Sequence, residues 1–232
     1  MILFKFKSLG RLDHVLDILL NDRLYCAPYS NLNDPFEGQF IAQNQISDRD
    51  WMQIFSHCVE KYGTDNGWEK VFQAPASWNR LFEASQGVEN TRTPRICSLS
   101  AGMSDVRMWA HYGDSHRGIA IEIDFSSLPQ RPVKVEYGKT LQCLDLTPKT
   151  EAEIFTYKTD HWQYEEEYRI IQDNAYYSIA GCIRAVHCGV RVTDETADLL
   201  EKATAGRFAV LRSALDKNGA KIVSHGKEGC TK

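Results

Sequence analysis

Three consecutive glutamates stand in the stretch WQYEEEYRII, residues 162–171, whose alternation otherwise predicts a β-strand. On a strand, Glu165, Glu167 and Arg169 would share one face, and the mostly apolar residues between them would share the other. Two carboxylates about 7 Å apart along a strand can hold a substrate hydroxyl and stabilise a cationic transition state, with Arg169 orienting Glu167 or binding an anion. The alternative is a solvated strand face with a local ion pair.

A Ser-x-Ser pair follows a basic, apolar strand pattern in RICSLS, residues 95–100. Ser98 and Ser100 would share one face of that strand and could offer two hydroxyls to a ligand. Serines also commonly end strands for purely structural reasons, so both interpretations stay open.

The segment MWAHYGDSHRG, residues 108–118, gathers several side chains that could contact a ligand: His111, Tyr112, His116 and Arg117. The two histidines are five positions apart and flank a glycine, so they do not form a zinc pair on one helical face. Histidine, aspartate and arginine at a helix end could bind a phosphate or a nucleotide ring. A structural turn with its aromatic side chains in the core is the alternative.

In NLNDPFEG, the oxygen side chains Asn33, Asp34 and Glu37 could bind a hard cation. An Asx-type turn with Phe36 as an apolar anchor explains the same residues, and the pattern favours that turn. The sequence contains no Walker A loop, no Gly-x-Gly-x-x-Gly, no Gly-x-Ser-x-Gly and no His-Glu-x-x-His. Their absence removes the commonest nucleotide-binding, hydrolase and zinc-protease interpretations, and no metal ligands are assigned.

The composition describes an ordinary globular chain of 232 residues, with a formal net charge of −4 and 43% hydrophobic residues. That charge predicts no general attraction to nucleic acids or to a membrane surface. The seven cysteines are odd in number and include no Cys-x-x-Cys, which argues against a disulfide framework. With no long apolar run, the chain is expected to be soluble and cytoplasmic, with reduced cysteines.

The elements that would position these residues follow from local periodicity. Strands are predicted over 2–7, 95–100, 118–125, 133–138, 162–171, 182–190 and 220–225. Helices are predicted over 9–20, after Ser8 as cap, over 105–113, after Ser104 as cap, and over 194–203 and 207–216. The stretch 23–38 is rich in turn residues and is expected to hold no continuous element.

A change of character over residues 42–94, where three short helices are predicted, marks a helical insert within a single domain spanning residues 1–232. The order of elements is mixed and does not follow a regular βαβ winding. The predicted fold class is therefore α+β, with a mixed or antiparallel sheet core and a helical insert.

The motifs NDPFE, MWAHYGDSHRG and YEEEYR, in this order and spacing, resemble a bacterial domain-of-unknown-function family numbered 2971. The resemblance runs over residues 1–190, apart from the insert, and that family label names no activity.

The layout also resembles, more loosely, that of ADP-ribosyltransferases, which implies an ADP-ribosyltransferase-like sheet and NAD as the substrate. The resemblance places a basic residue on the first strand, a Ser-x-Ser on a middle strand and a Glu-x-Glu on a late strand. It implies that Glu167 is catalytic, together with Glu165. The first strand carries lysine where arginine or histidine is expected, and lysine cannot make the bidentate contact of arginine.

We therefore expect an NAD-consuming transferase or glycohydrolase, whose toxin or phage-defence role and regulatory partner protein are implied by the resemblance alone. The acceptor, protein or nucleic acid, stays open. The residues expected to contact NAD are Lys5, Lys7, Ser98, Ser100, His111, Tyr112, His116, Arg117 and Arg169. Two alternatives remain. One is a metal-dependent nuclease or phosphodiesterase that uses Asp34, Glu37, Glu165 and Glu167 with His111 or His116. The other is a non-catalytic nucleotide- or partner-binding module.

Overall fold

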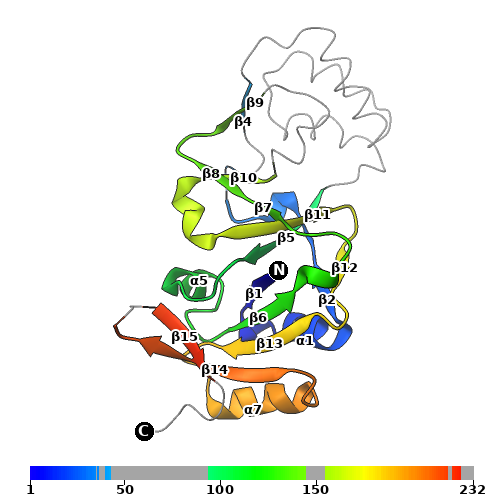
Figure 1. Ribbon diagram of the computed structural model, residues 1–232, viewed down its shortest axis with the longest axis vertical. Coiled ribbons are helices and arrows are strands. Elements are labelled where there is room, and N and C mark those ends of the chain that lie inside the picture. The colour runs from blue at the N-terminus through cyan, green and yellow to red at the C-terminus, as the bar shows by residue number, and fades with distance from the viewer. Residues whose placement is uncertain (35, 37–39, 43–93, 145–154, 219–220, 226–232) are drawn as a thin grey trace.

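The computed structural model describes residues 1–34, 36, 40–42, 94–144, 155–218 and 221–225 (Figure 1). The helical insert and its three helices, predicted over 42–94, lie almost wholly outside these residues. No helix in the described part of the chain is both long and apolar enough to cross a membrane.

Three helices and fifteen strands make up the described chain. The helices are α1 (Leu12–Asn21), α5 (Val106–His111) and α7 (Asp194–Ala203), with 3₁₀ turns at Leu9–Arg11, Tyr29–Asn31, Phe125–Ser127 and Asp160–Glu165. The first strands are β1 (Ile2–Lys7), β2 (Arg23–Tyr25), β3 (Ala27–Pro28), β4 (Phe40–Ala42), β5 (Arg95–Ser100), β6 (Ile119–Asp124), β7 (Val133–Lys134) and β8 (Glu136–Gly138). The remaining strands are β9 (Gln142–Leu144), β10 (Tyr157–Thr159), β11 (Glu167–Gln172), β12 (Tyr176–Ser178), β13 (Ile183–Cys188), β14 (Ala209–Asp216) and β15 (Lys221–His225).

A nine-stranded mixed sheet organises the fold, in the order β15-β14-β13-β6-β1-β5-β11-β7, with β3 also paired to β5. Only β13 and β14 run parallel among its described pairs, and α7 supplies the crossover that a parallel pair needs. Figure 1 shows β14, β15 and α7 at one end of the molecule and β7 and β11 toward the other. The predicted α+β class with a mixed sheet is confirmed.

The two faces of the sheet bury different side chains. One face packs against α1 and α7, where Val15, Leu19 and Leu200 join Ile121 and Val186 in the main core. The other face packs against α5 through a smaller cluster that contains Phe6, Trp109 and Ala120. This alternation follows from the period of two along each strand.

The sheet opens between its two central strands. All of β1, from Ile2 to Lys7, pairs with β6, but β1 pairs with β5 at one position only, Phe4 opposite Ser100. On its other side, β5 pairs with β11 over its whole length. Beyond Phe4 the two strands therefore separate, and backbone groups of both strands face the gap.

Most of the strands and helices predicted from periodicity are present, but the predicted helix over 207–216 is wrong. Ala209–Asp216 instead form strand β14, which pairs in parallel with β13 and antiparallel with β15. Val210 lies beside Val186 in this pairing and is buried. Long-range pairing has outweighed a local pattern that suits a helix equally well.

The predicted strand over residues 162–171 is correct only from Glu167 onward. Residues 160–165 form a 3₁₀ turn, and Glu166 follows it with a left-handed φ of 42°. Two smaller corrections concern helix and strand ends. The cap of α5 is Asp105, whose side chain accepts from the Arg107 backbone N–H at 2.8 Å, not Ser104. The predicted strand over 133–138 is divided into β7 and β8.

The turn after α5 contains three consecutive residues in the left-handed region of backbone conformation. Asp114, Ser115 and His116 all have positive φ, at 49°, 50° and 70°. This conformation brings the Gly118 N–H to the Gly113 carbonyl at 2.8 Å, and the Gly118 carbonyl accepts from Gly189. A Cβ on Gly118 would lie 2.3 Å from the carbonyl oxygen of Lys7, so the turn packs directly on the end of β1.

We predict that Gly118→Ala destabilises the protein by roughly 1–3 kcal/mol or more, because backbone atoms of Lys7 and Gly113 cannot yield to the added methyl group. Denaturant unfolding of both proteins measures the difference. Gly102→Ala is the matched control, since its Cβ would meet only the Glu166 carboxylate at an ordinary 3.5 Å. Equal stability of the two variants would contradict the packing described for this turn.

Candidate functional site

A cavity of about 330 Å³ lies where β1 and β5 separate. It lies at the small end of the range typical of ligand sites, about 300–1,000 Å³. Its walls come from β1, β5, β11, α5, β10 and the turn after β3. The lining residues include four cationic and two anionic side chains among the described residues: Lys5, Lys7, Lys158, Arg169, Glu165 and Glu167.

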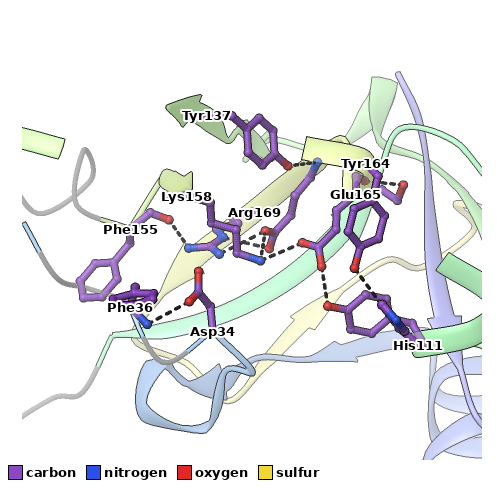
Figure 2. Close-up of polar contacts among 12 residues, drawn as sticks. Asp34, Phe36, His111, Tyr137, Phe155, Lys158, Tyr164, Glu165 and Arg169 are labelled. Carbon is purple, nitrogen blue, oxygen red and sulfur yellow. Dashed lines mark hydrogen bonds and ion pairs between the residues drawn. The ribbon is translucent and has the colours of Figure 1, made fainter. Parts of the chain in front are cut away.

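Lys158, on β10, connects the two glutamates. Its ammonium lies 2.8 Å from Glu165 Oε2 and 2.9 Å from Glu167 Oε2. All three side chains are at least nine-tenths buried, and Figure 2 shows Lys158 and Glu165 pointing toward one another. Burial lowers the pKa of Lys158, but the nearby carboxylates outweigh that effect and raise it above its ordinary value. The lysine is therefore charged.

Arg169 fixes the other side of Glu167. Its Nε and one terminal nitrogen donate to the two oxygens of the Glu167 carboxylate at 2.9 and 3.1 Å, and a second terminal nitrogen donates to the Phe155 carbonyl at 2.7 Å. Burial raises the pKa of Glu167, but the charges of Arg169 and Lys158 prevail and lower it to about 2. Glu167 is thus an ionised carboxylate held by two cations.

Neutral groups complete the network. The hydroxyl group of Tyr112, which follows α5, donates a hydrogen bond to Glu165 Oε1. Ser100 donates to the Glu165 backbone carbonyl at 2.7 Å, and the Tyr137 hydroxyl accepts from the Glu167 backbone N–H at 2.8 Å. Burial, and then Glu165, raise the pKa of Tyr112, so this phenol stays protonated and remains a donor.

The structure brings together most of the residues that the sequence singled out. The lining of the cavity includes Lys5, Lys7, Ser98, Ser100, Tyr112, Glu165, Glu167 and Arg169. Glu165 and Glu167 meet for a different reason than the one predicted. They flank a left-handed residue between a 3₁₀ turn and a strand, and they converge on Lys158.

His111, His116 and Arg117 do not line the cavity. His111 is exposed at the end of α5, and its Nδ1 lies 2.8 Å from the Tyr164 hydroxyl (Figure 2). His116 and Arg117 belong to the left-handed turn that packs on β1. The ligand-binding interpretation of the whole segment 108–118 is therefore limited, in this cavity, to Tyr112 and the apolar Met108.

Asp34 forms the predicted Asx turn, because its carboxylate accepts from the Phe36 backbone N–H at 2.9 Å. Glu37 lies outside the described residues. Within the described chain, no group of three or more histidine, cysteine, aspartate or glutamate side chains could hold a metal ion. Lys158, rather than a cation site, lies between the two cavity glutamates.

Sequence reasoning missed Lys158, the residue that joins the two glutamates. It stands in IFTYKTDHW, a segment with no recognisable motif, and its partner Glu165 is seven positions away. The one available signal was a lysine alternating with Tyr157 and Thr159 in a strand-like pattern, which predicts a strand but not a partner.

Comparison with protein-family models gives a match to part of the chain. Residues 108–170 match the model of the family described as "Protein of unknown function (DUF2971)". The matched segment, less than half of the chain, includes Tyr112, Lys158 and both cavity glutamates, and it confirms the family resemblance predicted from the motifs. No curated protein and no solved structure matches the chain.

The first prediction from this site concerns acid stability. Glu167 has a folded pKa of about 2 against an ordinary 4.5, so below pH 4.5 the unfolded chain binds a proton that the folded chain does not. Stability should fall as pH drops from about 4.5 to 2, by on the order of 3 kcal/mol from this group. Denaturant unfolding at several pH values measures the loss. The dependence of the unfolding free energy on pH should become weaker in Glu167→Gln. It should stay as in the wild type in Glu166→Gln, because Glu166 is an exposed neighbour.

A second prediction concerns Lys158. In Lys158→Met, Arg169 alone would compensate the negative charges of the two buried glutamates. The substitution should therefore cost roughly 3–5 kcal/mol of folding free energy. Adding Glu165→Gln should recover part of that loss, because it removes one of the uncompensated charges. Lys139→Met, at an exposed lysine, is the control. Additive effects of Lys158→Met and Glu165→Gln would show that the two residues are not coupled.

Proposed function

We propose that this protein is an ADP-ribosyltransferase-like, NAD-consuming enzyme that uses the cavity between β1 and β5. The observation that carries the proposal is the ionised, buried Glu167 on β11, which lines the same cavity as the lysines of β1 and the Ser-x-Ser of β5. These are the three positions that the looser resemblance assigns to NAD contact and catalysis.

The chemistry needs a fixed negative charge. When nicotinamide leaves, the bond between its nitrogen and ribose C1′ breaks, the electron pair stays with nicotinamide, and C1′ becomes part of an oxocarbenium ion. A buried carboxylate that is already fixed in place, as Glu167 is, stabilises that cation without reorganising. The acceptor then forms a bond to C1′ and loses a proton. Arg169 and Lys158 keep Glu167 ionised and oriented for this role.

The size and polarity of the cavity support a ligand that is only partly enclosed. About 330 Å³ suits a nicotinamide riboside with an adjoining phosphate better than a whole dinucleotide. Ser98, Ser100 and Tyr112 are among its polar lining residues. In this proposal the acceptor is a protein or a nucleic acid, and a toxin or phage-defence role with a regulatory partner follows from the resemblance alone.

Two other functions use the same residues. A metal-dependent nuclease or phosphodiesterase has less support, because Lys158 and Arg169 already neutralise Glu165 and Glu167, and because Asp34 is engaged in its turn. A non-catalytic nucleotide-binding module has one observation in its favour: both oxygens of Glu167 are already engaged by Arg169 and Lys158. A measurement of NAD turnover therefore distinguishes an enzyme from a non-catalytic binding module.

The decisive measurement is nicotinamide release from NAD by the purified full chain. Glu167→Gln keeps the shape of the side chain and removes its charge, so release should fall by roughly a hundredfold or more, as for other groups that stabilise transition-state charge. Glu166→Gln should leave release unchanged, because Glu166 is exposed and does not line the cavity.

Folding of each variant is checked by circular dichroism and by its unfolding midpoint. Release that persists in folded Glu167→Gln would remove Glu167 from the reaction. NAD that binds to the wild-type protein in calorimetry without any turnover would instead establish the binding module.

A further inference from the structure

Two cysteines face each other across neighbouring strands. Strand β3 pairs antiparallel with β5, with Ala27 opposite Ile96. One position further along each strand, the same register places Cys26 opposite Cys97. Both side chains are buried, and neither forms a disulfide. They are therefore a buried pair of thiols in directly facing positions.

The pairing geometry suits a bond between the two sulfur atoms. The Tyr29 N–H donates to the Pro94 carbonyl at 3.1 Å, and hydrogen-bonded positions alternate with non-hydrogen-bonded ones along an antiparallel pair. Cys26, three positions earlier, is thus at a non-hydrogen-bonded position, and its own N–H donates instead to the Ala175 carbonyl at 2.8 Å. At such positions facing Cα atoms lie about 4.5 Å apart, which is within the roughly 4.4–6.8 Å that a disulfide spans.

The two thiols differ in acidity. A hydrogen bond from Cys26 is the main cause that lowers the pKa of Cys97 to about 6. The charges of Lys5 and Lys7 act in the same direction, against the effect of burial. The same hydrogen bond raises the pKa of Cys26, so the proton stays on that sulfur. Cys97 is therefore a thiolate at neutral pH, which is the form that reacts with oxidants.

We propose that Cys26 and Cys97 form a redox-sensitive pair, which a small peroxide converts to a reversible disulfide. Lys5 and Lys7 line the cavity between β1 and β5, so the cavity gives hydrogen peroxide a route toward the Cys97 sulfur. The proposal does not depend on which reaction takes place in that cavity.

The oxidation proceeds in two steps. The Cys97 thiolate attacks one oxygen of hydrogen peroxide, the O–O bond breaks, and hydroxide leaves and takes up a proton to become water. The sulfur of Cys26 then attacks the resulting sulfenic acid, the S–O bond breaks, and a second water leaves with the proton of Cys26. Two thiols lose two electrons in total, and one peroxide is reduced to two molecules of water.

The disulfide would restrain one wall of the cavity. Strand β3 leads directly into the turn at Tyr29–Asn31, and residues 31–33 line the cavity. A bond from Cys26 to Cys97 would fix the start of this segment to β5. Oxidation should therefore make the segment from β3 to residue 33 more rigid.

Mass spectrometry of the wild-type full chain tests the bond. After brief treatment with hydrogen peroxide and alkylation of the remaining thiols, trypsin should release residues 24–49 linked to residues 96–107, each with a single cysteine. Dithiothreitol should separate the two peptides. Cys188→Ala is the matched control and should form the same bond, because burial raises the pKa of that thiol to about 11. Oxidised protein in which these two peptides are not linked would overturn the inference.

Single substitutions separate the roles of the two cysteines. Folded Cys26→Ser should accumulate a sulfenic acid on Cys97, which dimedone traps, because the second thiol is missing. In folded Cys97→Ser, oxidation of Cys26 should be slower by roughly tenfold or more, because that thiol keeps its proton. Equally fast oxidation of Cys26 in this variant would contradict the role given to Cys97. Peroxide with glutathione that leaves a lasting glutathione adduct on wild-type Cys97 would overturn the pair, because the facing thiol should displace it.

Stability and hydrogen exchange report the structural effect of the bond. The oxidised wild type should have a higher denaturant midpoint than the reduced protein, because the bond closes a long loop. Amide exchange over residues 27–33 should become slower. A lower midpoint would contradict the facing geometry, and unchanged exchange would contradict the effect on the cavity wall. None of these measurements uses NAD, so failure of the proposed reaction would leave the redox pair standing.

Discussion

The buried ammonium of Lys158, held between Glu165 and Glu167, is the interaction on which the rest of the site depends. Two carboxylates could not remain ionised side by side in this interior without a shared cation, because each loses most of its hydration on burial. Lys158 and Arg169 together supply the missing charge, and they tie β10 and the 3₁₀ turn to β11. The orientation of Glu167 follows from these contacts rather than from its own strand.

The place of the cavity follows from the pairing of the sheet. Where β1 leaves β5 after one shared position, the Ser98 carbonyl has no strand N–H opposite it, and the Lys5 ammonium takes that place. The same opening lets the lysines of β1 and the carboxylates of β11 line one cavity although a strand stands between them. A continuous sheet would have closed this cavity with backbone hydrogen bonds.

The local sequence pattern correctly predicted those elements for which tertiary contacts favour the same secondary structure. Strand β1, strand β5 and helix α7 appear at or close to their predicted bounds, because their apolar spacing and their capping residues favour a single structure. The stretch 209–216 has apolar residues that suit either structure, and pairing with β13 and β15 decides for a strand. At Glu166 the left-handed backbone is set by the packing of the turn, which no propensity of glutamate predicts.

The sequence by itself determined the residue types of the site: a basic first strand, a Ser-x-Ser, and a Glu-x-Glu with its arginine. Their strand periodicity was sufficient to place the lysines, the serines, Glu167 and Arg169 on the right strands, because periodicity is a local property, whereas Glu165 lies in the 3₁₀ turn before β11. The tertiary structure alone decided that Lys158 joins the glutamates, that His111 and His116 lie elsewhere, and that the lysines of β1 keep no carboxylate partner in the described chain. Those facts depend on contacts between residues far apart in sequence, and on which charges burial leaves unneutralised.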